Sequence, residues 1–524
     1  MRFQTAQRPV RFLPVQLWIL MLTLLNTLAR RRGLSCALIF FLPLALRVAL
    51  LPVWPIPLPA IYDEFSYLLS ADTFAHGRLA NPPHALPQFF ETIEILQNPT
   101  YASRYPPAQG LILAAGQALF GNPWFGAWLS CGLLLAAVLW AAYGWLPRRW
   151  ALATPLLLLH LCFADYWMNS FWGGAVAALG GTLLLGALGR LRANCAQPDL
   201  QRLILAAGVV ILALSRPFEG LLLAVPVAFA AIRRTPGPRA WLAPALVVLA
   251  GLAWLGYYNY RVTGSPLKMP YQAYFEQYET VPPLLFLTLA EPNSRTYGHF
   301  NFELLDNTWM REQWDAAHTP GFVLRRAREW VGCVRTLIGN PLWIIPLAGL
   351  LPWFFSRRKT RFLAALLCLI VLATFSEPGL FAHYVAPFAA VFALLLVQSI
   401  RRLGAPGMAC FVLLSSYSWG VFALQVARGA TPDRFRAANA FRGKLEAALG
   451  ASRDHVIFVH YTVAKIPHGE WIYNTADIDH QHVIWAQDMG PEQNKALLAY
   501  YPKRRFWYFE PDEPGAKPRP YTRP

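Results

Sequence analysis

The chain has 524 residues, of which 56% are hydrophobic and only 14% are charged, and its mean hydropathy is +0.34. Soluble domains carry about 25% charged residues, so this composition excludes an ordinary soluble globular protein. The net charge of +18 would also suit a nucleic-acid-binding protein, but many arginines form short runs between apolar segments, as in membrane proteins, so we expect no nucleic-acid partner. No CxxC pair occurs among the seven cysteines, so neither a zinc site nor a disulfide framework is predicted.

The first apolar stretch, LPVQLWILMLTLLNTLA, lies between two basic clusters, with Arg8 and Arg11 before it and Arg30, Arg31 and Arg32 after it. A spanning helix would leave one cluster outside the membrane, whereas an interfacial helix on the cytoplasmic face keeps both inside. The arginine triplet also stands where a signal peptide would have a small-residue cleavage site. Residues 1–33 are therefore predicted to be a cytoplasmic N-terminus with an interfacial helix.

Eleven further apolar segments approach the roughly 20 residues that a spanning helix needs. We predict a mainly α polytopic transmembrane bundle of about eleven spans over residues 34–429, with candidate spans at approximately 34–53, 124–146, 150–166, 173–189, 203–216, 220–232, 240–259, 341–355, 362–375, 383–399 and 408–427.

The basic runs between these segments all fall on one side when the chain is followed from span to span. The positive-inside rule makes that side cytoplasmic. The runs are Arg30 to Arg32, Arg148-Arg149, Arg190/Arg192, Arg233-Arg234, Arg357-Arg358-Lys359 and Arg401-Arg402. Three regions are then predicted to lie outside the membrane, namely the loops 54–107 and 261–340 and the tail 430–524.

The first outer loop contains AIYDEFSYLLSADTFAHG, with an acidic pair, Asp63 and Glu64, just after an apolar run. Acidic residues favour the first turn of a helix, where they complement its dipole, and this is one interpretation of the pair. The other is functional, because a carboxylate half-shielded from water at a membrane boundary suits a general base.

The segment YASRYPPAQGLILAAGQALFGNPWFGAWLS follows about 40 residues later. An acidic pair after the first span, a basic residue before a Pro-Pro pair, and an amphipathic helix ending in Phe-Gly resemble the GT-C membrane glycosyltransferases. The sequence is most similar to the branch of the protein O-mannosyltransferases and the lipid A aminoarabinose transferase. The resemblance covers roughly residues 34–400 in architecture, and its motifs are confined to about residues 62–121.

The resemblance implies roles for particular residues. Asp63 matches the family's first-loop aspartate, which activates the acceptor, and Glu64 stands beside it as a supporting residue or a helix-start charge. Arg104, followed by Tyr105, matches the basic residue that contacts the phosphate of the lipid-linked donor. The branch usually has lysine there, although the planar guanidinium of arginine also suits phosphate oxygens.

Four further outer candidates lie at helix ends. In EPGLFAHYVAPFAA the resemblance makes Tyr384, and less strongly His383, contacts for the donor phosphate, with an interfacial aromatic belt as the alternative. In LSRPFEGLLLA, Arg216 and Glu219 either pair with each other across three residues or help to bind the donor.

Asp165, in CFADYWMNSFWGG, is predicted to face the same side as Asp63. It would assist the base or hold a divalent ion, or else it is an ordinary solvent contact at a helix end.

The tail 430–524 is predicted to form a small exterior α/β domain. PDRFRAANAFRGKLEAALG and PEQNKALLAYYP are helical patterns, whereas HVIFVHY, HVIWA and RRFWYF are short apolar strands. No glycine-rich phosphate loop follows a strand, so nucleotide binding is not predicted. NTADIDHQH groups four potential metal ligands, Asp477, Asp479, His480 and His482, although such carboxylate spacings are common by chance. We therefore assign no metal site and expect no required cofactor, with a divalent ion left open.

These features predict an enzyme that moves a sugar from a polyprenyl-phosphate donor to a hydroxyl of a lipid, glycan or protein acceptor, with inversion and with Asp63 as the general base. The alternatives are a transporter or flippase for a lipid-linked saccharide, and a non-catalytic GT-C-like assembly component. The Ala-, Leu- and Arg-rich composition favours a bacterial inner membrane, with the active site and the tail in the periplasm.

Overall fold

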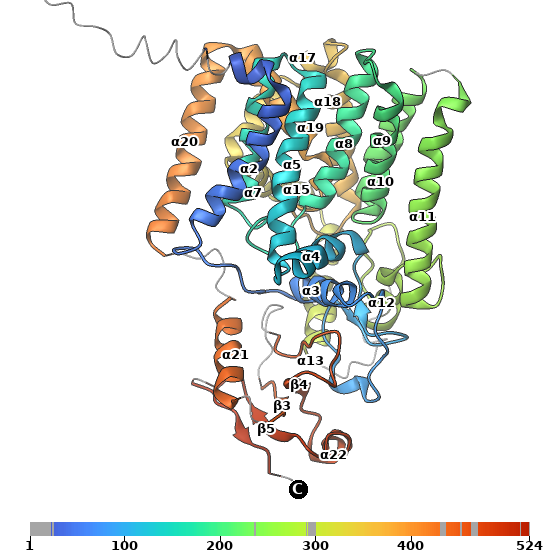
Figure 1. The fold of residues 1–524 in the computed structure, drawn as a ribbon, viewed down its shortest axis with the longest axis vertical. Helices are drawn as coiled ribbons and strands as arrows, with labels where there is room; N and C mark the ends of the chain where they lie inside the picture. The colour runs from blue at the N-terminus through green and yellow to red at the C-terminus, as the bar shows by residue number, and fades with distance from the viewer. Residues whose placement is uncertain are drawn as a thin grey trace, which may run out of the picture.

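The computed structural model describes residues 23, 26–234, 237–289, 291, 300–429, 436–450, 453–462, 470–513 and 515–522. Most of the predicted interfacial helix of residues 1–33 lies outside these ranges. Long helices form a bundle, the C-terminal strands lie at one end of it, and a layer of shorter helices separates the two (Figure 1).

The bundle consists of long helices and a few short ones that follow breaks at proline or glycine. Its helices are α2 (Arg32–Ala49), α5 (Trp124–Trp145), α6 (Arg148–Ala151), α7 (Ala153–Phe163), α8 (Ala175–Arg192), α9 (Pro198–Ala213), α10 (Pro217–Ile232), α11 (Leu242–Thr263), α15 (Phe322–Ile338), α16 (Ile344–Gly349), α17 (Leu351–Ser356), α18 (Arg361–Ala373), α19 (Ala389–Leu403) and α20 (Ala405–Ala427).

Six helices in the described ranges are long and apolar enough to cross a membrane, and a seventh crossing results if α15 and the bent segment after it count as one span. The six coincide with the predicted spans that begin at residues 34, 124, 173, 240, 383 and 408. The other five predicted spans are helical, but each of their helices is shorter than 18 residues. The polytopic helical architecture is thus confirmed, whereas the count of about eleven spans remains a prediction.

The outer loop predicted over 261–340 ends earlier than expected, because α15 belongs to the bundle. Trp330, Cys333, Val334 and Leu337 are all part of the buried core that α15 shares with the other bundle helices. Charged residues at 325, 326, 328 and 329 lower the average hydropathy of this helix, so its apolar face was not recognised as a bundle element. The assignment of all of 261–340 to an outer loop is therefore wrong for α15.

The layer between the bundle and the tail comes mainly from the two outer loops. It contains α3 (Tyr62–Ala75), α4 (Pro107–Phe120), α12 (Pro270–Tyr278), α13 (Phe300–Glu303), a π-helical segment (Leu304–Met310), α14 (Arg311–Ala317) and the two-stranded antiparallel pair β1 (Ile95–Leu96) and β2 (Ala102–Ser103). Proline at the start of α4 and α12 suits a helix N-terminus, where its missing N–H would have had no partner.

The tail contains a sheet of order β4-β3-β5-β6, preceded by α21 (Arg436–Leu449). The central strands β3 (His455–Val459), β4 (Val483–Gln487) and β5 (Arg505–Phe509) are parallel, α22 (Pro491–Tyr500) connects β4 to β5, and β6 (Arg519–Pro520) pairs antiparallel with β5. β3, β4, β5 and α22 overlap the segments whose sequence patterns predicted strands and a helix. The two-residue strand β6 was missed because its sequence, Arg-Pro, carries no strand signal.

The two faces of this sheet have different neighbours. Val456, Phe458 and Ile484 pack against residues of the first outer loop, including Phe89 and Phe90. The alternate residues, such as Ile457 and Trp485, pack against Trp471 and against Leu445 of α21. Successive side chains of a strand point to opposite faces of the sheet. One face therefore packs within the tail, and the other packs against the loop that contains α3.

Candidate active site

The start of α3 separates the two acidic side chains of the sequence pair. The Glu64 carboxylate is buried and accepts hydrogen bonds from the backbone N–H groups of Ala60 (2.6 Å), Ile61 (3.3 Å) and Phe171 (3.0 Å). It therefore caps α3 and ties the helix to the segment after α7. Asp63 remains partly exposed, and its Oδ1 accepts a 2.5 Å hydrogen bond from the hydroxyl of Tyr105.

Tyr105 is held in place by other tyrosines. Its ring stacks on Tyr67, with centroids 4.5 Å apart, and meets Tyr271 edge-on at 5.5 Å. Burial raises the pKa of Tyr105 well above its usual value, so its phenol keeps its proton and acts as the donor toward Asp63. Stacking thus fixes the direction from which the hydrogen bond reaches the carboxylate.

Arg104 lies between two carboxylates that the sequence analysis did not single out. Its Nη1 is 2.9 Å from Oε2 of Glu94 and 2.5 Å from Oε1 of Glu279, and its guanidinium lies 4.4 Å from the ring centre of Tyr274. All three charged side chains are largely buried. Arg104 is therefore committed to an internal ion network, a geometry that suits a structural role better than phosphate binding.

Glu94 and Glu279 together carry more negative charge than Arg104 can neutralise, and this raises the proton affinity of Glu94. Burial raises its pKa to about 8, the nearby charges of Asp63 and Glu279 add to the effect, and Arg104 opposes it. One cation thus faces two buried carboxylates, and this imbalance favours the protonated form of Glu94.

Arg216 and Tyr384 form the second part of the site. Arg216 precedes α10, its Nη1 lies 3.5 Å from Oε1 of Glu219, and its guanidinium lies 4.7 Å from the ring centre of Tyr384. The predicted pairing of Arg216 with Glu219 is therefore present, together with a cation–π contact across the bundle. The positive charge of Arg216 also lies close enough to Tyr67 and Tyr271 to interact with them electrostatically. Because both tyrosines contact Tyr105, the Arg216–Tyr384 pair lies next to the Asp63–Tyr105 pair.

The turn that carries Tyr384 is fixed by close backbone packing. A Cβ atom at Gly181 of α8 would lie 1.9 Å from the carbonyl oxygen of Pro387, so only glycine permits this approach. His383 is buried, with Nδ1 3.2 Å from the hydroxyl of Tyr166 and its ring 4.4 Å from that of Trp172. The ring of His383 also meets that of Tyr384 edge-on, with centroids 4.7 Å apart, so His383 is a packing partner of Tyr384.

Asp165 has its own surroundings. It follows α7, and its carboxylate accepts a 2.8 Å hydrogen bond from the N–H of Tyr166. These contacts connect Asp165 to the Tyr166–His383 pair rather than to Asp63.

The structure adds one buried acid, Glu377, to the Arg216 side. Only 5% of this residue is exposed, and neither carboxylate oxygen has a hydrogen-bond partner within the described ranges. Arg326 donates a hydrogen bond to its backbone carbonyl, and burial raises the pKa of its side chain to about 8. The Glu-Pro-Gly spelling marked a turn in the sequence, but nothing there indicated that the side chain points inward.

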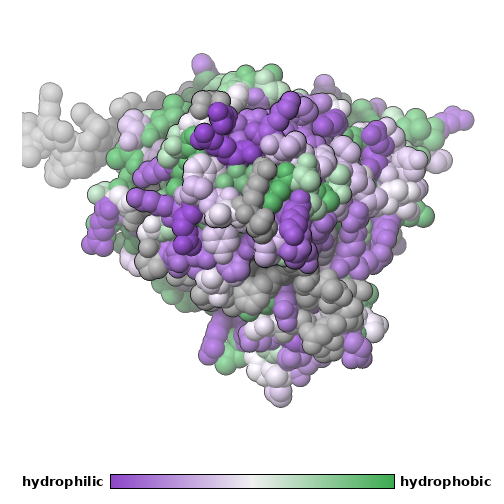
Figure 2. Space-filling model, turned by 90° about the horizontal axis from the view of Figure 1, so that it is seen from below, coloured by the Kyte–Doolittle hydropathy of each residue, from purple (hydrophilic) through white to green (hydrophobic). Residues whose placement is uncertain are grey.

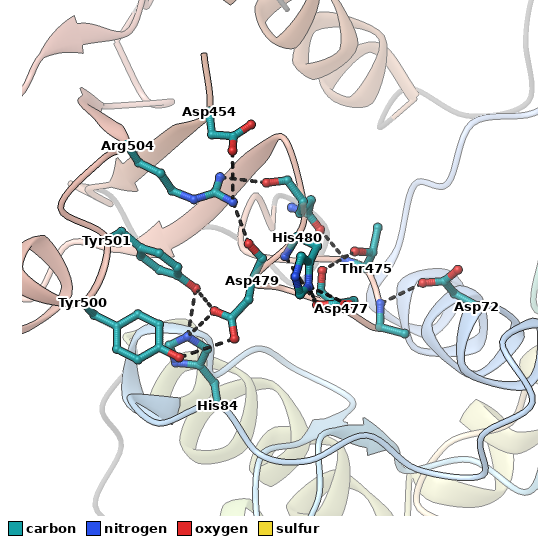
Figure 3. Close-up of polar contacts among 12 residues, drawn as sticks. Asp72, His84, Asp454, Thr475, Asp477, Asp479, His480, Tyr500, Tyr501 and Arg504 are labelled. Atoms are coloured by element: carbon teal, nitrogen blue, oxygen red, sulfur yellow. Dashed lines mark hydrogen bonds and ion pairs between the residues drawn. The ribbon is translucent and has the colours of Figure 1, made fainter.

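The predicted metal-ligand cluster in the tail is divided among other partners (Figure 3). Asp477 pairs with His480 at 2.9 Å, Asp479 accepts a 2.5 Å hydrogen bond from Tyr501, and His482 lies 3.1 Å from Asp454. The described residues contain no group of three or more His, Cys, Asp or Glu side chains arranged to hold a metal ion. Asp479 instead lies 3.3 Å from His84 and so connects the tail to the first outer loop.

The tail also docks directly on α3. The rings of Phe65 and Tyr473 stack with centroids 3.5 Å apart, and Asp72 accepts a 2.8 Å hydrogen bond from the N–H of Ala476. The helix that carries Asp63 is thus covered on its outer side by the tail, a contact that nothing in the sequence indicated. Figure 2, which views the molecule from this end, shows hydrophilic residues over much of the surface.

The fold is similar to that of ArnT from Cupriavidus metallidurans. The apo crystal structure of ArnT shares 14% identity with this chain, covers 95% of it and 93% of ArnT, and gives a TM-score of 0.51. The structure bound to undecaprenyl phosphate has 14% identity, coverages of 91% and 92%, and a TM-score of 0.50. The Archaeoglobus fulgidus oligosaccharyltransferase in complex with Zn and sulfate has 13% identity, coverages of 91% and 67%, and a TM-score of 0.44.

No protein-family model and no curated protein matches the sequence. At identities of 13–14% the similarity concerns the fold. The resemblance drawn from the sequence motifs therefore agrees with the structural comparison in overall fold. The chain thus shares the overall helical fold of ArnT.

Proposed function

We propose that the protein transfers a sugar from a polyprenyl-phosphate-linked donor to an acceptor hydroxyl, with inversion at the anomeric carbon. The observation that carries this proposal is the hydrogen bond from Tyr105 to Asp63 beside the Arg216–Tyr384 pair. The site thereby places a fixed carboxylate and a cation within one group of tyrosines. An inverting displacement uses the carboxylate to take the acceptor proton and the cation to stabilise the departing phosphate. One ArnT structure holds undecaprenyl phosphate, which supports the choice of a lipid phosphate as the leaving group.

Asp63 is the proposed general base. As the acceptor oxygen forms its bond to the anomeric carbon, the hydroxyl proton moves to Oδ2 of Asp63, the oxygen that does not accept from Tyr105, and the bond between that carbon and the phosphate oxygen breaks on the opposite face. The hydrogen bond from Tyr105 holds Oδ1 and so orients Oδ2. Glu64 is a positioning residue, because its oxygens are occupied by the backbone N–H groups of three residues.

Arg216, with Tyr384, is the proposed anchor for the departing phosphate. Its positive charge would stabilise the growing negative charge on the leaving group in a site partly shielded from water. Arg104 fits this task less well, since it is already paired with Glu94 and Glu279. We assign it, with Tyr105, to positioning Asp63. His383 and Glu219 support Tyr384 and Arg216, and Asp165 supports the Tyr166–His383 pair.

We further propose that α3, α4 and the tail lie on the periplasmic side of a bacterial inner membrane. The basic runs at the other end of the bundle support this orientation. The five helical segments that are too short to cross alone would combine with flanking turns or tilt to complete about eleven spans. The acceptor would be a lipid, a glycan or a protein that reaches the outer layer.

The test is a transfer assay with the purified full-length chain in proteoliposomes. The probes are radiolabelled undecaprenyl-phosphate hexose and undecaprenyl-phosphate aminopentose, and the acceptors are extracted envelope lipids, glycans and peptides. The proposal expects a labelled product whose anomeric configuration is opposite to that of the donor. Translocation of either probe across the liposome membrane without any product would identify a flippase instead. A retained configuration would exclude the single displacement at Asp63.

A further inference from the structure

Two adjoining cavities open at the end of the bundle remote from α3 and the tail. Both are formed where the helices α5 and α8 end. The first also borders the starts of α2 and α9, and the second borders the segments that follow α10 and α17. The first has a volume of about 380 Å³, the second of about 360 Å³, and Gly144 and Ala193 line both. The proposed catalytic residues contribute to neither cavity.

The walls of both cavities are strongly basic. The first is lined by Arg32 and Arg190 and the second by Arg192, Arg234 and Lys359, and no Asp or Glu of the described residues lines either one. Within the described ranges none of these five side chains has an ion pair, whereas Asp199, on the same side, is paired with Arg202. Arg32 repels Arg190, and Arg234 repels Arg192. A bound anion would remove this repulsion.

Two of the cations are held in fixed positions. The Arg190 guanidinium lies 3.9 Å from the ring centre of Trp140 and donates to the carbonyl oxygens of Gly186 (3.1 Å) and Trp140 (2.6 Å). Arg192 lies 4.9 Å from the ring centre of Trp145 and donates to the carbonyl oxygen of Arg358 at 3.1 Å. A guanidinium has five N–H donors, so both arginines retain donors in a planar arrangement that matches phosphate oxygens.

The first cavity also has a buried acceptor. Gln201 lines it and is 6% exposed, and its Oε1 has no hydrogen-bond partner among the described residues. A buried amide oxygen without a partner costs free energy unless a ligand group donates to it. The cavity therefore offers an acceptor for a hydroxyl next to its cations.

We propose that the two cavities together bind the headgroup of an anionic phospholipid with two phosphates, one in each cavity, and with its glycerol hydroxyl directed to Gln201. Basic pockets between the cytoplasmic ends of transmembrane helices are typical sites for such headgroups. The pairing of two cavities that share one wall favours two linked phosphates over one. This inference goes beyond the proposed sugar transfer and does not depend on it.

The test is lipid binding by the full-length chain in neutral detergent, measured by native mass spectrometry with added cardiolipin, phosphatidylglycerol, phosphatidylcholine or inorganic phosphate. The variant combines Arg32→Gln, Arg234→Gln and Lys359→Gln, three exposed side chains in the cavity walls. The matched control combines Arg149→Gln, Arg401→Gln and Arg402→Gln, which are exposed on the same side but line neither cavity. Unfolding in lipid-free detergent checks that both variants are folded.

Cardiolipin is expected to bind the unchanged chain more tightly than phosphatidylglycerol, and phosphatidylcholine and free phosphate to bind weakly. The triple variant should bind cardiolipin about a hundredfold more weakly, and the control should stay within about twofold. Equal losses in variant and control would overturn the site, and so would free phosphate that binds as tightly as lipid. Arg32→Gln alone and the Arg234→Gln/Lys359→Gln pair should each lower cardiolipin affinity, and an effect confined to one of them would overturn the two-phosphate arrangement.

Discussion

The hydroxyl of Tyr105 donates a 2.5 Å hydrogen bond to Oδ1 of Asp63, across 42 residues of sequence. Stacking on Tyr67 fixes the donor, and the cap at Glu64 fixes the helix that carries the acceptor. The pair therefore joins the two sequence motifs on which the functional prediction rests. Its geometry leaves Oδ2 of Asp63 as the atom available to take a proton.

Removal of the Tyr105 hydroxyl should slow transfer without unfolding the site. Tyr105→Phe keeps the ring stacked on Tyr67 but leaves Asp63 without its orienting donor. A lost hydrogen bond to a charged group corresponds to about 1.5–3 kcal/mol, so kcat should fall roughly tenfold to a hundredfold while the KM for the donor stays within about twofold. Steady-state transfer kinetics with the responsive undecaprenyl-phosphate probe would measure both. A rise in KM with unchanged kcat would show that Tyr105 contacts the donor instead.

The two neighbouring acids should respond differently to the same change. Glu64→Gln places an amide N–H₂ in a pocket of backbone N–H groups and should lower stability by about 2–3 kcal/mol. Asp63→Asn, at a partly exposed position, should change stability by less than about 0.5 kcal/mol. Thermal unfolding in detergent, followed by the fluorescence of the 20 tryptophans, compares the two variants. Equal transitions would contradict the structural role of Glu64.

Substitutions of Arg104 and of Arg216 should have different effects on stability and on binding. Arg104→Gln leaves the buried carboxylates of Glu94 and Glu279 without their cation, and it should destabilise the fold by about 3–5 kcal/mol. Arg216→Gln removes one longer ion pair, with Glu219 at 3.5 Å, so it should destabilise the fold less than Arg104→Gln and weaken undecaprenyl-phosphate binding about tenfold to a hundredfold. Thermal unfolding and binding titrations with undecaprenyl phosphate give the two readouts. If Arg104→Gln keeps its stability but loses binding, Arg104 is the phosphate anchor.

Glu94 should make the folded protein less stable as the pH rises. Burial raises its pKa from 4.5 to about 8, so between these values the folded protein holds a proton that the unfolded chain releases. The stabilisation is complete below about pH 4.5 and is lost as the pH rises toward 8, at up to about 1.4 kcal/mol per pH unit. Glu94→Gln should flatten the decline of Tm between pH 5 and 8.

Glu377 should also make the protein less stable as the pH rises, since burial raises its pKa to about 8. Glu377→Gln should flatten the same decline, and the double variant should flatten it further. The controls are Tm profiles of Glu492→Gln, whose side chain is 82% exposed and which should follow the unchanged chain. Parallel profiles for all five proteins, the unchanged chain and the four variants, would show that neither acid holds its proton in the folded state.

The parts of the site that could be predicted are those with local signals. The acidic pair, the Arg-Tyr-Pro-Pro segment and the Arg-Pro-Phe-Glu turn each stand at a boundary between apolar and polar sequence, and topology alone places them on one side. The six long spans were found for the same reason, because about 20 apolar residues in a row are a strong pattern.

The parts that could not be predicted depend on contacts between distant segments. Nothing in the sequence around Glu279 indicates that it meets Arg104, 175 residues away, or that Tyr473 would cover Phe65. The burial of Glu377 likewise depends on a distant contact, because its backbone carbonyl accepts a hydrogen bond from Arg326 of α15, a helix whose own charges concealed its place in the bundle. Site residues that pair across the fold therefore became visible only when the packing was known.

The central claim, that Asp63 takes the acceptor proton, is tested most directly by single-turnover transfer with Asp63→Asn. The donor probe is the one that the unchanged chain uses, and Asp199→Asn, an exposed carboxylate at the other end of the bundle, is the control. Loss of a general base should slow the chemical step about 10²- to 10⁴-fold, with donor binding and Tm unchanged. A single-turnover rate within about threefold of that of the unchanged chain would contradict the assignment of Asp63 as the base.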